Sequence, residues 1–118
     1  MPITSNEPFG FYRYETANFA LRIVSKQGEE KPLEDYQSIR VSIAQPGVEP
    51  EHLTEKDVGV DVEESRIHVH LTQEQTGKFR EGEAKIQVNI YYIDTERDTT
   101  AQGKLVVKEN LYKQVMTG

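Results

Sequence analysis

The stretch that decides the fold is Glu83-Ala-Lys-Ile-Gln-Val-Asn-Ile-Tyr-Tyr-Ile93. Apolar side chains occupy every second position from Ala84 to Tyr92, and the positions between them are polar up to Tyr91. Successive side chains of a β-strand point to opposite faces of a sheet, so this alternation predicts a strand with one buried face and one wet face. Such strands are typical of antiparallel sheets that bury only one side.

Other segments repeat this alternation, and polar stretches rich in turn-forming residues separate them. One such turn is predicted at Gln45-Pro-Gly-Val-Glu-Pro50. The predicted strands, about seven in number, are Phe9–Tyr14, Asn18–Ser25, Tyr36–Gln45, Val58–Val62, Arg66–Leu71, Glu83–Ile93 and Thr99–Lys108. Short strands at this spacing predict an all-β sandwich or barrel.

The segment Thr72-Gln-Glu-Gln-Thr-Gly-Lys-Phe79 departs from the strand pattern. Thr72 and Gln75 have the spacing of a capping box, and Gly77 is placed to stop a helix after about one turn. A short helical turn is therefore predicted here. Near the C-terminus, the spacing of Leu111 and Val115 fits both a terminal helical turn and an extended arm.

The chain has 118 residues, of which 36% are hydrophobic and 29% charged. A chain of this length buries about two thirds of its unfolded surface and can fold alone. With no internal repeat or linker in the sequence, we expect one domain over residues 9–118, preceded by an N-terminal arm over residues 1–8.

Charge and cysteine content exclude several classes of protein. The formal net charge is -6 without a basic cluster, which disfavours binding to nucleic acid or to an anionic membrane surface. The sequence has no cysteine, so disulfides, thiolate catalysis and cysteine metal sites are excluded. The opening MPITSNEPFG lacks the basic and apolar regions of a signal peptide, so we expect synthesis in the cytoplasm.

His68 and His70 would share one face of a strand, a spacing that some metal sites use for two nitrogen ligands. The sequence shows no third ligand nearby, and alternation alone places polar residues on a solvent face. We therefore interpret both histidines as surface residues and predict no metal site.

The acidic loop Asp94-Thr-Glu-Arg-Asp98 has oxygen ligands of the kind that calcium prefers, but it lacks the glycine and distal glutamate of an EF-hand. A hairpin turn in which Arg97 relieves the acidic repulsion is the favoured interpretation. The motifs of serine hydrolases, phosphate-binding loops and zinc peptidases are absent. No catalytic residue and no cofactor is predicted, so the chain is not expected to be an enzyme.

Aromatic residues cluster near the N-terminus at Phe9, Phe11, Tyr12 and Tyr14. They fit a first strand that closes the domain's own sandwich with Phe9 and Phe11 inward, an arm that docks on a neighbouring subunit, or an aromatic platform for sugars. The candidate interface residues are Phe9, Phe11, Tyr12, Tyr14, Leu111 and Tyr112. The polar positions of the strands supply a candidate ligand face, comprising Arg40, His68, His70, Gln87, Asn89 and Tyr91.

The order of strand, helical turn and strand across Ile67–Ile93 resembles the connection between the sheets of an immunoglobulin-type sandwich. The longer run IHVHLTQEQTGKFREGEAKIQVNIYYIDTERDTTAQGKLVVKENL resembles small structural proteins of tailed phages and prophages of Gram-positive bacteria. The resemblance covers about Tyr36 to Leu111. The matching residues are Leu71, Thr72, Gln73, Glu74, Thr76, Lys78, Phe79, Gly82, Ile86, Gln87 and Val88.

This resemblance implies an immunoglobulin-like antiparallel β-sandwich without an active site, belonging to a tail, baseplate or head-completion component of a virion. The implied partners are other phage structural proteins or further copies of the chain, joined through edge strands and terminal arms. The implied location is the bacterial cytoplasm at synthesis and then the virion. The alternative that we carry forward is a carbohydrate-binding or adhesion module that uses the candidate ligand face.

Overall fold

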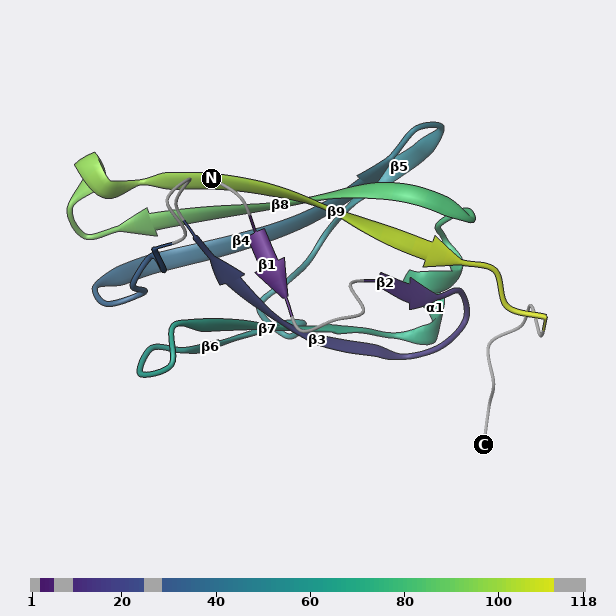
Figure 1. Ribbon diagram of the computed structural model, residues 1–118, viewed down its shortest axis with the longest axis horizontal. Coiled ribbons are helices and arrows are strands. Elements are labelled where there is room, and N and C mark those ends of the chain that lie inside the picture. Colours follow the sequence, from purple (N-terminus) through teal and green to yellow (C-terminus); the bar gives the residue numbers. More distant parts are fainter. Residues whose placement is uncertain (1–2, 6–9, 25–28, 112–118) are drawn as a thin grey trace.

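The computed structural model describes residues 3–5, 10–24 and 29–111. Two β-sheets lie face to face, and the loops gather at the two ends of the long axis (Figure 1). The strands are β1 (Ile3–Ser5), β2 (Gly10–Tyr12), β3 (Ala17–Ile23), β4 (Tyr36–Gln45), β5 (Val48–His52), β6 (Val58–Asp61), β7 (Arg66–Leu71), β8 (Gly82–Tyr92) and β9 (Thr99–Lys108). Two short helical turns are α1 (Gln73–Gly77) and η1 (Thr95–Arg97).

The first sheet has the strand order β1-β3-β7-β6 and the second has the order β2-β9-β8-β4-β5. Paired strands run antiparallel except for β2, which runs parallel to β9. The N-terminal part of the chain thus supplies an edge strand to each sheet. This connectivity is that of an immunoglobulin-like sandwich, so the predicted all-β fold class is confirmed.

The structure adds two strands to the seven that the sequence predicts. β1 forms within the expected N-terminal arm, where residues 3–5 pair with β3. β5 begins within the predicted turn Gln45–Pro50, so that prediction is right only for its first half: Gly47 has a φ of +77°, where the chain reverses, and the strand begins at Val48. Pro50 is tolerated because β5 is an edge strand, where a missing N–H donor is not needed.

The other predicted strands agree with the structure to within a few residues at each end. β4, β7 and β9 have the predicted bounds, and β2 covers only the middle of the predicted strand Phe9–Tyr14. The alternation in β8 also has the predicted effect, because its inward side chains are at most 3% exposed. Each large aliphatic side chain buried in this way stabilises the fold by roughly 1.5–3 kcal/mol. The inward residues of β8 are Ala84, Ile86, Val88, Ile90 and Tyr92.

The predicted helical turn is confirmed as α1, which connects β7 in the first sheet to β8 in the second. The backbone N–H of Gln75 donates to Thr72 Oγ1 at 3.2 Å, and that of Thr72 donates to Gln75 Oε1 at 2.7 Å, which completes the predicted capping box. Gly77 ends α1, but not through a left-handed turn, since the next residue, Lys78, is still helical. Glycine is needed because the Tyr14 ring lies 2.5 Å from where a Cβ would be.

Candidate functional site

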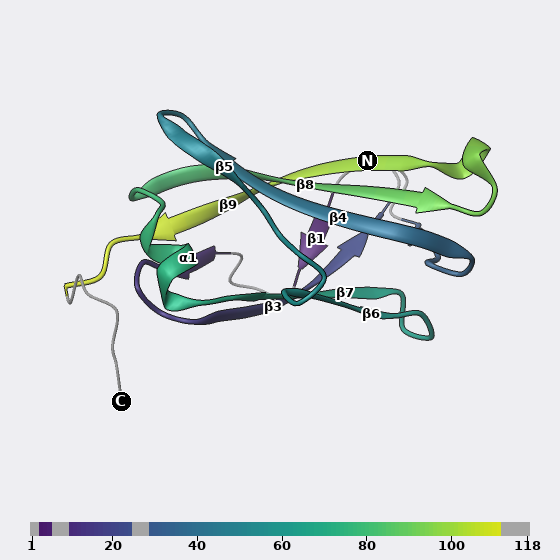
Figure 2. The same cartoon turned by 180° about the vertical axis from the view of Figure 1, so that it is seen from behind.

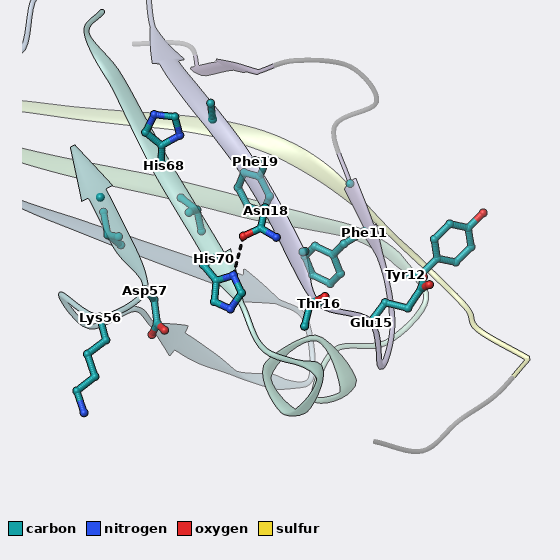
Figure 3. A pocket seen from close by; sticks show the side chains of 16 residues that line it. Phe11, Tyr12, Glu15, Thr16, Asn18, Phe19, Lys56, Asp57, His68 and His70 are labelled. Atoms are coloured by element: carbon teal, nitrogen blue, oxygen red, sulfur yellow. Dashed lines mark hydrogen bonds between the residues drawn. The ribbon is translucent and has the colours of Figure 1, made fainter. Parts of the chain in front are cut away.

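A hollow of about 800 Å³ lies on the outer face of the first sheet, over β3, β7 and β6 (Figure 3). His68 and His70 both project into it from β7 and both are exposed, as the alternation predicts. Tyr12, Glu15 and Lys56 border the hollow. It is therefore an open surface with both polar and apolar side chains.

The strand register explains the shape of this hollow. His68 lies between Ala20 of β3 and Gly59 of β6, so the neighbours on both sides of its ring are small. His70 lies beside Asn18, and its Nδ1 is 2.6 Å from Asn18 Oδ1. An amide oxygen only accepts hydrogen bonds, so Nδ1 is the donor in this contact.

Asp57, an acidic residue beside the two histidines, already accepts hydrogen bonds from other side chains. Asp57 Oδ2 accepts hydrogen bonds from Gln75 Nε2 at 3.2 Å and from Thr54 Oγ1 at 3.3 Å. Within residues 3–5, 10–24 and 29–111, no group of three histidine, aspartate or glutamate side chains is arranged to hold a metal ion. The chemistry that this hollow offers is hydrogen bonding through two exposed imidazoles.

The outer face of the second sheet carries a connected row of neutral polar side chains. Gln102 Nε2 donates to Gln87 Oε1 at 2.8 Å, and Gln87 Nε2 donates to Asn89 Oδ1 at 3.1 Å. Asn89 Nδ2 in turn donates to Thr100 Oγ1 at 3.0 Å. These bonds hold the amides in fixed orientations across β8 and β9.

The candidate ligand face divides between the two sheets. Arg40 and Asn89 are paired in the register of β4 and β8, and Tyr91 follows on the same outer face with 40% of its surface exposed. His68 and His70 lie on the outer face of the other sheet. The six residues therefore do not form one surface, since the core of the sandwich separates the two groups.

The described aromatic residues near the N-terminus have three different environments. Phe11 is 6% exposed and its ring centroid lies 5.7 Å from that of Phe79 in the core, as predicted for a strand of the domain's own sandwich. Tyr12 is 47% exposed, with Lys108 Nζ 5.2 Å from its ring centroid. Tyr14 has a φ of +61° and lies against Gly77.

Of the remaining candidate interface residues, only Leu111, which follows β9, is among the described residues. Leu111 is fully exposed and is not helical. Phe9 and Tyr112 lie outside the described residues, as does the rest of the predicted terminal turn or arm after Leu111.

A polar clamp around Arg13 is not signalled by the sequence. Its Nη1 lies 3.0 Å from both carboxylate oxygens of Glu109, and its Nη2 donates to the carbonyl of Gly77 at 3.0 Å. The clamp joins the end of β2 to α1 and to the chain after β9. Its partners are far apart in sequence, so no local pattern signals it.

The acidic loop is the predicted turn. Asp94 Oδ1 accepts from the backbone N–H of Glu96 at 3.1 Å, and this caps η1. Arg97 lies 3.9 Å from Asp94 and 3.6 Å from Asp35, so it relieves the acidic repulsion as expected.

No family model and no curated protein matches this chain. Among solved structures, the chain is similar to the endo-β-1,4-mannanase from Thermotoga petrophila, with a TM-score of 0.51 and 10% identity over 92% of this chain and 19% of that one. It is also similar to the fibronectin(III)-like modules of CbhA from Clostridium thermocellum, with a TM-score of 0.39 and 16% identity over 91% and 96% of the two chains. No helix among the described residues is long and apolar enough to span a membrane.

The chain thus spans about a fifth of the length of the mannanase. At this identity the similarity concerns the fold alone, and it agrees with the two-sheet topology. The protein is a β-sandwich module of the immunoglobulin-like type.

Proposed function

We propose that this protein is a non-enzymatic structural component of a phage or prophage virion, belonging to its tail, baseplate or head-completion assembly. It is made in the bacterial cytoplasm and joins other phage structural proteins, or further copies of itself, through edge strands and terminal arms. It uses no cofactor and binds neither nucleic acid nor membrane.

This proposal rests on the structural roles of the residues that carry the resemblance to phage proteins. Thr72 caps α1, Phe79 is 1% exposed in the core, and Gly82 has a φ of +131° at the start of β8. Ile86 and Val88 are fully buried in β8. The shared residues thus serve the construction of a sandwich, which fits a structural component better than an enzyme.

The edges of the second sheet support assembly by strand addition. β2 pairs only with Val106–Lys108, so among the described strands β8 is the only ladder partner of β9 from Ala101 to Leu105. An unpaired edge accepts an extended segment from another chain. Leu111, fully exposed just after β9, adds an apolar contact point near the C-terminus.

Mass spectrometry of purified particles tests the proposal. Phage particles are induced from the strain that encodes the chain, banded on a density gradient and digested, and peptides of the chain are counted against those of the major capsid protein. We expect the chain to be present at a constant ratio to the capsid protein across the particle band. Its presence in the lysate and absence from the band would refute a virion role.

The second candidate function is carbohydrate binding or adhesion through the outer face of β4 and β8. It is favoured by the exposed Tyr91 and by Arg40, for which no ion pair or hydrogen bond is found among the described residues. A glycan panel tests it with Tyr91→Ala as the binding variant and Tyr12→Ala, which removes a ring of similar exposure elsewhere, as the control. Glycan binding lost only in Tyr91→Ala supports this function, and no binding by the unmodified chain excludes it.

A further inference from the structure

A second hollow, of about 520 Å³, lies on the outer face of the second sheet beside the β4–β5 turn. We call it the lysine-rimmed hollow; Pro46, Val48 and Pro50 line it together with the charged side chains Glu83, Lys85 and Lys104. Ala44, Lys85 and Lys104 form one row across β4, β8 and β9, so the small alanine lies next to the two cations.

The rim holds two lysines and one glutamate, so it keeps a positive net charge although the whole chain has a net charge of -6. Lys104 pairs with Glu83 at 3.5 Å, but both side chains are mostly exposed. No carboxylate within the described part of the chain lies at ion-pair distance from Lys85. An apolar floor with a cationic rim fits an apolar side chain flanked by carboxylates.

A surface of that composition lies at the other end of the same sheet. Ile93, which follows β8, is 71% exposed, and Asp94 and Glu96 come directly after it. Its backbone N–H donates to the carbonyl of Asp35 at 3.1 Å, which brings Asp35 and the neighbouring Glu34 beside it. We call this set of five residues the acidic tip. Arg97 lies among them, 3.9 Å from Asp94 and 3.6 Å from Asp35, so four carboxylates and one guanidinium leave the tip with a negative net charge.

The acidic tip and the lysine-rimmed hollow of one copy cannot meet. β4 and β8 run between them, and strands of this length span roughly 30 Å. Figures 1 and 2 show η1 and the β4–β5 turn at opposite ends of the molecule. A contact between the two surfaces must therefore join different copies, and because the surfaces differ it is heterologous and repeats from copy to copy.

We propose that copies of this chain associate head to tail, with Ile93 of one copy seated in the lysine-rimmed hollow of the next copy. Asp94, Glu96 and Glu34 then face Lys85 and Lys104 across the contact. The contact rests on the proposed role as an assembling structural protein and gives that role a specific geometry. Repetition produces a ring where the rotation closes and a filament where it does not.

Charge reversal on the two surfaces tests the contact in the full chain. The hollow variant is Lys85→Glu with Lys104→Glu, and the tip variant is Glu34→Lys with Glu96→Lys; all four side chains are exposed. Mass is measured by light scattering after size exclusion over a concentration series. We expect the unmodified chain to form oligomers at low salt that dissociate at high salt, since the screening length falls from about 10 Å at 0.1 M to about 3 Å at 1 M.

Each charge-reversal variant alone is expected to raise the apparent dissociation constant by at least about tenfold, because like charges then meet across the contact. An equimolar mixture of the two variants should restore assembly, since each reversed surface finds a reversed partner and each unchanged surface finds an unchanged one. Ile93→Ser, which changes no charge, should weaken assembly of the unmodified surfaces. Equal unfolding midpoints exclude misfolding as the cause.

Two results would overturn the contact. One is an unmodified chain that is monomeric at every concentration and salt, and the other is an oligomer that neither charge-reversal variant weakens or their mixture fails to restore. Neither result bears on the particle measurement above, which reports whether the chain is in the virion. Failure of this contact and failure of the proposed function are thus distinguishable.

Discussion

Gly82 and Gly59 show how differently single glycines act in this sandwich. Gly82 has a φ of +131°, where side chains are disfavoured, and no atom lies within 4 Å of where its Cβ would be. Gly59 has no such φ, and its Cβ would meet only the Cβ of His68, at 3.8 Å, an ordinary contact. A side chain at Gly82 would therefore meet backbone strain without a steric clash, whereas a Cβ at Gly59 would meet neither.

Gly82→Ala should lower the free energy of unfolding by about 1–3 kcal/mol through backbone strain alone. Gly59→Ala is the matched control and should leave the stability unchanged or raise it by up to about 1 kcal/mol, because alanine restricts the unfolded chain. Urea denaturation followed by circular dichroism measures both. Equal losses in the two variants would contradict the role given to the conformation of Gly82.

Tyr92 is a buried phenol with cations over its ring. Its hydroxyl donates to the carbonyl of Pro32 at 2.9 Å, and the Arg97 guanidinium carbon lies 4.8 Å from the ring centroid. Burial raises the pKa of Tyr92 above its ordinary value of 10.0, and the nearby charge of Arg97 only partly opposes this. The folded state therefore holds the phenolic proton more tightly than the unfolded state.

It follows that the Tyr92 contribution to stability is complete below pH 10 and is lost as the pH rises through the folded-state pKa. Tyr92→Phe should remove this alkaline loss and cost about 0.5–1.5 kcal/mol at neutral pH through the missing hydrogen bond. Unfolding midpoints from pH 8 to pH 11 measure the effect, with Tyr91→Phe as the exposed control. The same alkaline slope in Tyr92→Phe as in the unmodified chain would contradict it.

At the scale of the element, the edge strand β2 has only three residues and depends on contacts outside its own ladder. Phe11 anchors it in the core beside Phe79, and its backbone approaches β9 so closely that a Cβ on Gly10 would lie 2.3 Å from the Val106 carbonyl oxygen. Arg13 then ties the end of β2 to Glu109.

A double-mutant cycle with Arg13→Met and Glu109→Gln should give a coupling free energy of about 1–2 kcal/mol. This value lies below that of a fully buried charged pair because the two side chains are 18% and 30% exposed. The matched cycle with Lys104→Met and Glu83→Gln, an exposed pair, should give less than about 0.5 kcal/mol. Similar coupling in both cycles would mean that the clamp contributes no more than a surface ion pair.

For the whole molecule, the N-terminal segment belongs to the folded sandwich. Deletion of residues 1–14 would remove an edge strand from each sheet together with the buried Phe11. We expect the deletion to lower the unfolding midpoint strongly and to expose β9 to aggregation, measured by thermal circular dichroism and light scattering. Tyr12→Ser is the control that keeps the fold, and a deletion variant as stable as the full chain would show that this segment is a separate arm.

The sequence predicted the features that depend on residues close together in the chain, and it did not predict those that depend on distant residues. The alternation in β4, β7 and β8 depends only on neighbouring residues, and these strands were located closely. β5 was missed because Pro50 disfavours a strand, and only its edge position makes it tolerable. The Arg13 clamp was missed because its partner Glu109 is 96 residues away.

The sequence by itself determined the strands with regular alternation, where the helical turn begins and which side chains of those strands face the core, since the period of two and the capping box are local properties. Only the tertiary structure decided which strands are neighbours and which polar residues share a face. It placed His68 and His70 on one sheet, Arg40 and Asn89 on the other, and Ile93 at the opposite end from Lys85. These relations depend on pairing between distant segments, which no local pattern records.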